Sequence, residues 1–172
     1  MYNNFVVVGP SEDPAELHEA LDVFSAFRLI ADSGSNFVSR GDDSGTHKRE
    51  LALWRKAGAD PTLASGDWYR EVGKGMGATL NSAVAMKAYT LTDRGTWISY
   101  RGKRDFEILY QGGRDLYNPY GAILVSSEKH PRTKSAQGRI FVEWLTSSRG
   151  QRAVEQYKIG GEQLFFPMPA FD

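Results

Sequence analysis

The sequence predicts an α/β fold with a largely parallel or mixed sheet, because short apolar runs alternate along the chain with segments of helical spacing. The first run, residues 5–8, is rich in β-branched side chains and stops at Gly9-Pro10, which is typical of a buried strand. Residues 20–31 follow with apolar side chains at helical spacing, namely Leu21, Phe24, Phe27 and Ile30. The same alternation of strand and helix continues through the chain.

The remaining elements follow in order from apolar spacing and from breaks at glycine, proline and aspartate. Strands are expected at residues 37–38, 89–92, 106–109 and 120–126, the last being strongly apolar. Helices are expected at residues 46–57, 68–72, 80–88, 96–100, 134–145 and 150–157. Among the large aromatic side chains, Trp54, Phe141 and Trp144 are expected in the hydrophobic core.

The composition excludes several classes of function. With 172 residues, the chain has the length of one domain or of a pair of small lobes. Its 21 basic residues balance 21 acidic ones, so we expect neither nucleic acid nor an anionic membrane as a partner. Cysteine is absent and the three histidines are isolated, so no disulfide, no metal site and no cofactor are expected. No apolar run reaches transmembrane length, and residues 1–4 do not resemble a signal peptide.

The most informative motif is residues 39–47, Ser-Arg-Gly-Asp-Asp-Ser-Gly-Thr-His, between the expected strand 37–38 and the expected helix 46–57. A helix N-terminus carries unpaired backbone N–H groups and the positive end of the helix dipole. Gly45 would let an anion approach these amides, and the hydroxyls of Ser44 and Thr46 add donors. Arg40 contributes a planar guanidinium suited to an oxygen-rich anion. The motif predicts a site for a small oxyanion, although ordinary capping by Ser44 or Thr46 explains the same pattern.

A second glycine-rich segment, residues 73–80, also leads into a helix. It is not a P-loop, because Trp68 stands where that motif requires glycine and no serine or threonine follows Lys74. The dinucleotide-binding pattern fits only in a relaxed form, and the segment expected before it is a helix rather than a strand. Thr79 lies near the start of the expected helix, where it is either a ligand or a structural cap.

Support for a catalytic centre is weak. The Gly-x-Ser-x-Gly motif of a nucleophile elbow does not occur. Asp42 and Asp43 are adjacent carboxylates, but in a turn they point in different directions. They are better suited to holding Arg40 or capping the helix than to acid–base chemistry. Two helix starts and an arginine that converge on one anion need no proton transfer, so we expect a binding protein rather than an enzyme.

Four segments together resemble the tungstate-binding, substrate-binding component of bacterial ABC transporters. They are residues 2–10, 37–47, 75–80 and 88–96, of which 37–47 is the longest and most specific. The core of Arg40, Ser44, Gly45 and Thr46 is also similar to phosphate-binding relatives of the same superfamily, in which the equivalent residues grip the anion. In those relatives the carboxylate that matches Asp42 orients the arginine.

The resemblance implies a type II periplasmic-binding-protein-like fold, with one complete lobe and the C-terminal part of a second lobe. Residues 1–10 would form a first crossing strand, 10–116 the complete α/β lobe with the anion site, and 117–172 a return strand and the C-terminal helices of the incomplete lobe. Residues 121–125 would be the second crossing strand. The expected ligands are Arg40, Ser44, Gly45, Thr46 and Thr79, supported from behind by Asp42 and Asp43, with Thr92 and Asp93 as weaker candidates that a helix cap explains as well.

The resemblance also implies that tungstate, or molybdate, is bound for delivery to an ABC permease on the periplasmic or extracytoplasmic side of the membrane. Proteins of this family carry an upstream half-lobe and usually a signal peptide, so this chain is expected to lack its N-terminal part. Open strand edges and apolar surface on an incomplete lobe would favour self-association. Two alternatives remain: a ligand-sensing or remnant oxyanion-binding domain uncoupled from transport, and an enzyme acting on a phosphate ester.

The choice between tungstate and phosphate depends on the family pattern more than on chemistry. Tungstate at neutral pH carries no proton, so its site needs donors alone, whereas hydrogen phosphate needs at least one acceptor. Asp42 or Asp43 could supply that acceptor, so the sequence leaves the two anions open. Molybdate and tungstate are nearly equal in size, and the sequence does not separate them.

Overall fold

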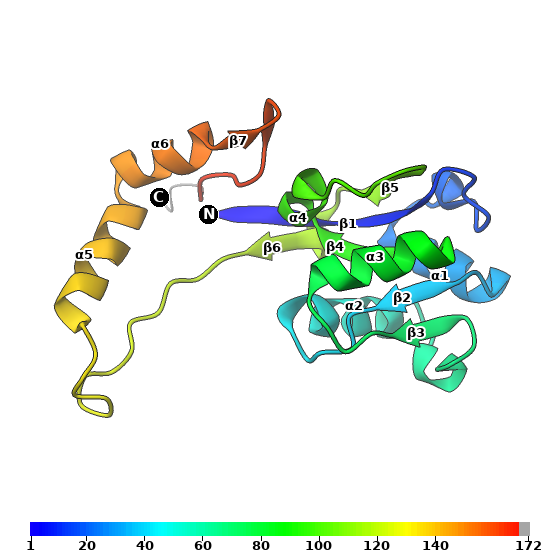
Figure 1. Cartoon of the computed structure of the whole chain (residues 1–172), viewed down its shortest axis with the longest axis horizontal. Helices are drawn as coiled ribbons and strands as arrows, with labels where there is room; N and C mark the ends of the chain where they lie inside the picture. Colours follow the sequence, from blue (N-terminus) through cyan, green and yellow to red (C-terminus); the bar gives the residue numbers. More distant parts are fainter. Residues whose placement is uncertain (169–172) are drawn as a thin grey trace. The chain divides into compact units, whose positions relative to one another are not determined.

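The structure, a computed structural model, describes residues 1–168 and divides the chain into two compact units. The larger unit is Asn4–Tyr117, and the smaller unit combines Met1–Asn3 with the chain from Asn118 onward. Figure 1 labels the α-helices and most of the strands of both units.

The larger unit is built on a sheet whose central strand is β1 (Tyr2–Pro10). This strand pairs in antiparallel fashion with β4 (Thr90–Asp93) on one side and with β5 (Phe106–Gln111) on the other. The short strand β6 (Tyr117–Pro119) also pairs with β1. The predicted strand at residues 5–8 is therefore confirmed, and its side chains Val6, Val7 and Val8 are fully buried.

Two further strands extend this sheet beyond β4. β2 (Phe37–Ser39) and β3 (Tyr69–Glu71) form a parallel pair, and a parallel bridge between Phe37 and Tyr89 joins β2 to the residue just before β4. The strand order is then β3–β2–β4–β1–β5. The sequence predicted either a largely parallel or a mixed sheet, and the sheet is mixed.

Helices pack against both faces of the sheet. They are α1 (Val23–Ser33), α2 (Gly45–Lys56), α3 (Met76–Met86) and α4 (Arg94–Ser99), with short 3-10 turns at Leu17–Glu19, Pro61–Ala64 and Arg114–Leu116. Alternate residues of a strand point to opposite faces. Phe5 and Val7 accordingly join a core cluster with residues of α1 and α2, and Val6 and Val8 join a second cluster with α3 and α4.

Capping explains where the helices begin. The helix predicted at 20–31 starts later, at Val23, because Asp22 and Ser25 form a reciprocal capping box at its N-terminus. It ends at Gly34, which adopts the left-handed conformation (φ 63°) common at helix ends. The helices predicted at 46–57, 80–88 and 96–100 are found within a few residues of their expected bounds. Trp54 of α2 lies in the core as expected.

Residues 68–72, predicted as a short helix, contain strand β3 instead. Tyr69 pairs with Phe37 of β2, and the two rings stack with centroids 6.1 Å apart. Aromatic residues favour strands where a neighbouring strand is present to pack against. The pairing with β2 therefore overrides a weak local helical pattern.

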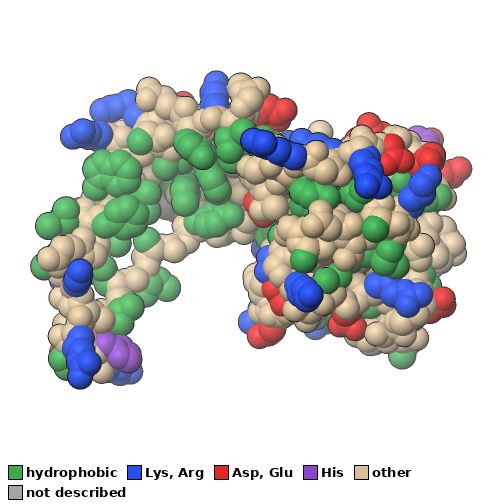
Figure 2. Space-filling model, in the orientation of Figure 1, with side chains coloured by type: hydrophobic (Ala, Val, Ile, Leu, Met, Phe, Trp, Pro, Cys, Tyr) green, Lys and Arg blue, Asp and Glu red, His purple; other side chains and the backbone are tan. Residues whose placement is uncertain are grey.

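The smaller unit exposes much of its apolar surface. Its helices are α5 (Ser135–Thr146) and α6 (Ser148–Gln156), followed by a hairpin of β7 (Lys158–Ile159) and β8 (Glu162–Gln163). Figure 2 shows hydrophobic side chains gathered over the helices of this unit. Phe141 is 58% exposed and Trp144 is 40% exposed, so the prediction that they lie in the core is wrong.

The predicted strand at 120–126, including the crossing strand at 121–125, is also wrong. The strand at this point is β6, which ends at Pro119, and residues 121–126 have no regular structure. A strand needs a neighbour that takes its backbone hydrogen bonds. Beyond Tyr120, whose amide donates to the carbonyl of Met1, no strand among residues 1–168 pairs with this run. Ile123 is consequently 92% exposed.

Within residues 1–168, none of the helices combines the length and the apolar character that crossing a lipid bilayer would require.

Candidate anion-binding site

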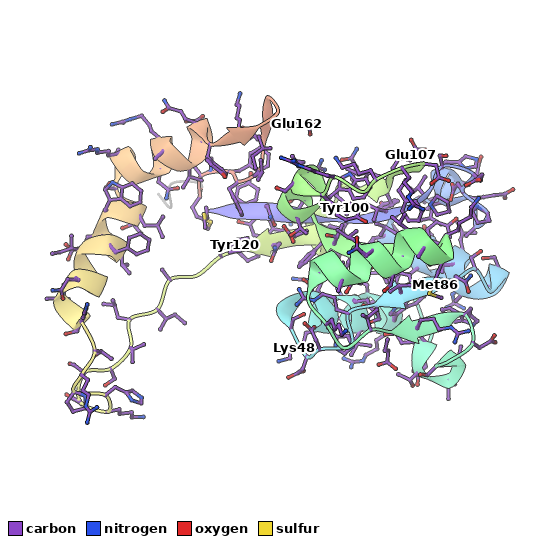
Figure 3. The ribbon with its side chains drawn as sticks, in the orientation of Figure 1. Lys48, Met86, Tyr100, Glu107, Tyr120 and Glu162 are labelled. Carbon is purple, nitrogen blue, oxygen red and sulfur yellow. The ribbon has the colours of Figure 1, made fainter. Side chains whose placement is uncertain are left out.

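Three helices begin at one edge of the sheet in the larger unit. β2 is parallel to β3 and is joined to β4 by a parallel bridge, so the carboxyl ends of these three strands lie at the same edge. α2 follows β2, α3 follows β3 and α4 follows β4. In Figure 3, Lys48 near the start of α2 lies at this end of the unit, and Met86 at the end of α3 lies at the opposite end. Open α/β sheets bind ligands outside the carboxyl ends of their strands.

Arg40 follows β2 directly and is held by Asp42. Its Nε donates to Oδ2 of Asp42 at 3.1 Å, and its Nη2 donates to the same oxygen. The other oxygen, Oδ1, accepts the backbone amide of Ser44 at 3.2 Å. Hydrogen bonding from Ser44, and then from Arg40, lowers the pKa of Asp42 to about 2 against the opposing effect of desolvation. Asp42 is therefore ionised at neutral pH, and Nη1 of Arg40 makes no hydrogen bond to another of residues 1–168.

The turn after Arg40 contains two residues with positive φ. Gly41 (φ 57°) lies against β3, where an added Cβ would come within 2.9 Å of Cβ of Glu71. Asp43 also has φ 57°, and its amide donates to Nδ1 of His47 at 3.1 Å. Aspartate tolerates the left-handed region better than most residues, whereas position 41 needs glycine for both its conformation and its space.

The first turn of α2 presents backbone donors beside Arg40. Ser44 is the N-cap, and its Oγ accepts the amide of His47 at 3.3 Å, so the capping explanation holds for this residue. An acceptor for the amides of Gly45 and Thr46 is not available inside the helix. A Cβ added at Gly45 would meet no atom within 4 Å, so that side of the helix start is open. The Ser44 hydroxyl also hydrogen-bonds to Asp42, so it can donate to an anion only by turning away from that carboxylate.

The glycine-rich loop before α3 lies beside the same turn. The amide of Gly73 donates to the carbonyl of Arg40 at 2.8 Å, and that of Val72 donates to the carbonyl of Ser39 at 3.0 Å. The two glycine-rich segments do converge, as the sequence suggested. The expectation that a helix precedes this loop is wrong, since β3 does. The strict dinucleotide pattern is still absent from the sequence.

The start of α3 is open but carries no polar side-chain cap. Its N-cap is Gly75, which makes no side-chain capping bond, and a Cβ added at Gly75 or Gly77 would meet nothing within 4 Å. Thr79 is fully buried, and its hydroxyl lies 3.4 Å from the carbonyl of Lys74 and 3.3 Å from that of Gly75. In this structure the Thr79 hydroxyl stabilises the loop by hydrogen-bonding to its backbone.

The weaker candidates lie at the start of α4, at the same edge of the sheet. Asp93 caps this helix by accepting the amide of Thr96 at 2.9 Å and its hydroxyl at 2.5 Å. Thr92 is fully buried and its hydroxyl donates to the carbonyl of Asp93 at 3.2 Å. The capping explanation thus applies to Asp93.

Two groups beside the turn were missed by the sequence analysis. Glu50 of α2 is 1% exposed and accepts hydrogen bonds from Ser39, Trp54 and Tyr69. Burial raises its pKa to about 7, although these hydrogen bonds act to lower it. The burial of Glu50 could have been inferred from helical spacing. Glu50 stands four residues before the core residue Trp54, and residues four apart lie on the same face of a helix. Nε2 of His47 is buried without a partner among the described residues.

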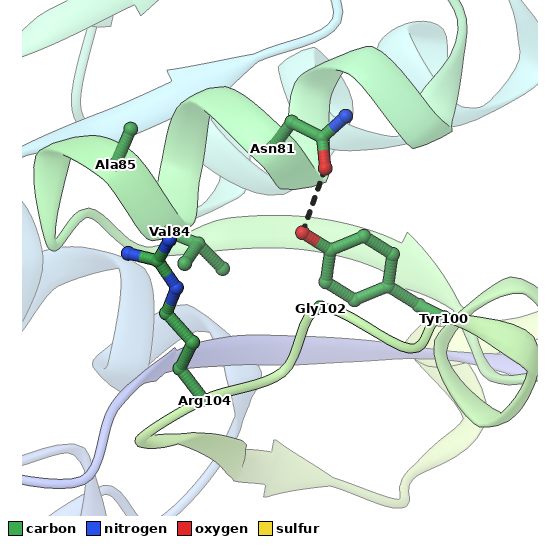
Figure 4. A pocket seen from close by; sticks show the side chains of 6 residues that line it. All are labelled: Asn81, Val84, Ala85, Tyr100, Gly102 and Arg104. Carbon is green, nitrogen blue, oxygen red and sulfur yellow. Dashed lines mark hydrogen bonds between the residues drawn. The ribbon is translucent and has the colours of Figure 1, made fainter.

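A groove of about 300 Å³ lies between α3 and the segment 100–104 (Figure 4). Its lining residues are Asn81, Val84, Ala85, Tyr100, Gly102 and Arg104. The Tyr100 hydroxyl donates to Oδ1 of Asn81 at 2.9 Å. None of the predicted ligands lines this groove. Residues 1–168 also contain no cluster of histidine, aspartate and glutamate that could hold a metal ion.

The sequence profile of the PBP superfamily domain matches residues 1–149. This chain belongs to the PBP superfamily. The tungstate-binding protein TupA of Peptoclostridium acidaminophilum is 40% identical over 174 residues, which cover 99% of this chain and 60% of TupA. The predicted superfamily and the periplasmic-binding-protein-like α/β fold are confirmed by these matches.

Solved structures of the superfamily have the same fold. The tungstate-binding protein TupA of Desulfovibrio alaskensis G20 superposes with a TM-score of 0.82 at 39% identity, over 99% of this chain and 69% of that one. The tungstate ABC transporter structure from Geobacter sulfurreducens gives a TM-score of 0.83 at 44% identity, over 91% and 66% of the two chains. The present chain spans 60% of the length of the Peptoclostridium protein and 49% of a relative from Haloferax volcanii.

Proposed function

We propose that this chain binds a tetrahedral oxyanion without chemical change, with tungstate as the ligand and molybdate as a close analogue, for delivery to an ABC-type permease. The observation that carries the proposal is the turn 40–46. The Arg40 guanidinium in this turn is held by an ionised Asp42, beside the open first turn of α2. Charge-assisted hydrogen bonds and helix N-termini are the two devices with which proteins hold such anions.

The proposed ligands provide three kinds of hydrogen-bond donor. Arg40 supplies a charged N–H group, Gly45 and Thr46 supply backbone amides, and Ser44 and Thr46 supply hydroxyls. The loop 73–77 adds open amides at the start of α3, next to Arg40. Asp42 and Asp43 shape the turn and do not touch the anion. Thr79 acts through the conformation of that loop.

The state of the carboxylates supports a fully deprotonated dianion. Hydrogen phosphate must donate its proton to an acceptor in the site. Asp42 already accepts from Arg40 on one oxygen and from Ser44 on the other. Asp43 is exposed, with Lys48 at 3.3 Å from its carboxylate. Three donors already occupy most of the roughly four acceptor positions of Asp42, and Asp43 faces solvent, so the donor set suits tungstate better than hydrogen phosphate.

The names of the relatives support the anion and the pathway. Proteins named for tungstate binding are 40% and 31% identical to this chain over nearly its full length. We accordingly place the chain with binding proteins rather than enzymes, on the extracytoplasmic side of the membrane, with an ABC permease as partner. Binding by donors alone requires no covalent step, which is consistent with that assignment.

The proposal is tested by thermal unfolding and calorimetry with tungstate, molybdate, sulfate and phosphate at matched ionic strength. A ligand that binds only the native state, at about 100 times its Kd, stabilises that state by about 2.7 kcal/mol. We expect tungstate and molybdate to raise the melting temperature and phosphate to leave it nearly unchanged. A chain that responds to phosphate but not to tungstate, or to none of the four anions, contradicts the proposal.

A further inference from the structure

Glu50 is a buried carboxyl group without a cationic partner. It is 1% exposed, and no ion pair among residues 1–168 includes it. Its oxygens accept three neutral hydrogen bonds, from the hydroxyl of Ser39 at 2.7 Å, that of Tyr69 at 2.8 Å and Nε1 of Trp54 at 3.3 Å. A buried carboxylate stabilised only by neutral donors loses much of its hydration without gaining an opposite charge.

Glu50 is connected to the anion turn through a single side chain. The hydroxyl of Ser39 donates to Glu50 and accepts the amide of Gly41 at 3.2 Å. Ser39 and Gly41 are the two neighbours of Arg40 in the sequence. Two hydrogen bonds therefore separate the carboxyl group from the backbone of the turn. A charge at one end of this chain acts on the other end through an interior of low polarity.

The charges around Glu50 leave its own negative charge uncompensated. On β3, the carboxylate of Glu71 raises the pKa of Glu50 by repulsion, and Tyr69 is a neutral donor. At the end of β2, Arg40 is already paired with Asp42. On α2 itself, Arg49 donates to the carbonyl of Tyr117 at 3.5 Å, and Lys48 pairs with Asp43 at 3.3 Å. One residue further back is His47, whose Nδ1 accepts the amide of Asp43. Burial is the main reason that the pKa of Glu50 is raised to about 7.

We propose that Glu50 is an affinity-determining residue of the oxyanion site, and that its carboxylate takes up a proton from solvent when an anion binds at the turn 40–46. This inference rests on the proposed function. A dianion adds negative charge close to Glu50 and disfavours its ionised form. By linkage, the anion binds more tightly when Glu50 is neutral. The carboxylic acid formed donates its new O–H to Ser39, and the Ser39 hydrogen turns from Glu50 to the Tyr69 oxygen. The Ser39 oxygen still accepts the amide of Gly41.

Glu50→Gln is a close mimic of the neutral acid. The amide oxygen can accept from Tyr69 and Trp54 as the carboxylate does, and the amide nitrogen can donate to Ser39. The hydrogen of the Ser39 hydroxyl then turns to the oxygen of Tyr69, with which Ser39 also hydrogen-bonds, so the variant is expected to fold. Tyr69→Phe is an independent variant. It removes a hydrogen bond that lowers the pKa of Glu50, and so moves the titration of this group to higher pH.

The experiment is calorimetric titration of the full chain with tungstate between about pH 6 and 8, in cationic buffers of different ionisation enthalpy, which gives the number of protons taken up. We expect proton uptake near neutral pH and a rise in Kd of about tenfold across this range. Glu50→Gln should lose most of the proton uptake, and its Kd for tungstate should change little with pH. Tyr69→Phe should move the maximum of uptake to higher pH. Glu107→Gln, the same change at an exposed position on β5, should keep the proton uptake.

Three results separate the possibilities. Tungstate binding with unchanged proton uptake in Glu50→Gln overturns the role of Glu50 and leaves the proposed function intact. Uptake that disappears in His47→Asn instead places the proton on the imidazole and overturns the inference as well. Absence of tungstate binding by the unmodified chain at every pH overturns the proposed function together with the coupling.

Discussion

The starts of α2 and α3 lie side by side at one edge of the sheet, but they are built differently. The α2 start has an arginine held by a carboxylate, a serine cap and a buried glutamate behind it. The α3 start has glycine at its N-cap, no side-chain cap and an apolar interior apart from Thr79. The comparison indicates a division of roles, in which α2 supplies charge and fixed geometry and α3 supplies open backbone donors.

The largest expected effect concerns Glu50, which has no counterpart at α3. Its pKa is raised from 4.5 to about 7 in the folded chain. The folded state then holds a proton that the unfolded state has lost, so its contribution to stability is present below about pH 4.5 and is lost as the pH rises through about 7. The free energy of unfolding of Glu50→Gln, relative to the unmodified chain, should rise by about 3 kcal/mol across this window. Denaturant unfolding at several pH values measures it, and parallel pH profiles would show that Glu50 titrates normally.

The next effect is on binding through Arg40. Arg40→Ala should weaken tungstate binding by about 2 kcal/mol or more, because it removes the charged donor and leaves Asp42 unpaired. Arg40→Lys should recover part of this loss, since it restores the charge without the planar fork. Arg101→Ala removes the same charge from an exposed position of the larger unit and serves as the control. Equal losses in Arg40→Ala and Arg101→Ala, measured by calorimetry, would mean that only the overall charge matters.

Gly41→Ala tests whether the turn at α2 is rigidly built. We expect a loss of about 2 kcal/mol in stability, because alanine must adopt φ 57° and its Cβ would lie 2.9 Å from Cβ of Glu71. Gly34→Ala imposes a similar conformation (φ 63°) in open space, and should cost about 1 kcal/mol. Thermal or denaturant unfolding measures both. If the two variants lose the same stability, contact with β3 does not constrain the turn.

Ser44→Ala removes the side-chain cap that α3 does not have. It should cost about 1 kcal/mol in stability by leaving the amide of His47 without its acceptor. Ser147→Ala removes the equivalent cap at α6, where Oγ accepts the amide of Gly150 at 3.2 Å. Both variants should be destabilised, but only Ser44→Ala should also weaken tungstate binding. Unimpaired binding in Ser44→Ala would reduce the role of this serine to capping.

The smallest expected effect is at α3. Gly77→Ala should stabilise the fold by about 0.5 kcal/mol, because alanine favours the helix and its Cβ would meet no neighbour. The same methyl group would narrow the approach to the amides of the loop, so tungstate affinity should fall. A variant that gains stability and keeps its full affinity would show that α3 does not contribute donors.

The elements of the larger unit were largely predictable from sequence because their patterns are local. The apolar run at 5–8, the spacing of 20–31 and the capping residues before each helix are read from a few neighbouring residues. The failures at 68–72 and 120–126 have a different cause. Whether Tyr69 joins a strand depends on β2, which lies thirty residues earlier, and whether residues 121–125 pair depends on a neighbouring strand that residues 1–168 do not provide.

The candidate site was predictable in part for the same reason. Arg40, Ser44, Gly45 and Thr46 lie within one short motif, and their proximity follows from the sequence. Glu50 acts through Ser39 and Tyr69, and its role appears only when β2, β3 and α2 are placed together. The burial of Thr79 and Thr92 likewise depends on packing against the sheet, so a hydroxyl at a helix start could not be ranked as a ligand from sequence alone.

The most direct test of the account is a crystal structure of the chain with tungstate, using the anomalous signal of tungsten to locate the anion. We predict one tungsten position beside the turn 40–46, within hydrogen-bond reach of the Arg40 guanidinium and of the Gly45 and Thr46 amides. Tungsten found elsewhere, for example in the groove on α3 lined by Asn81 and Arg104, with the turn unoccupied, would contradict it.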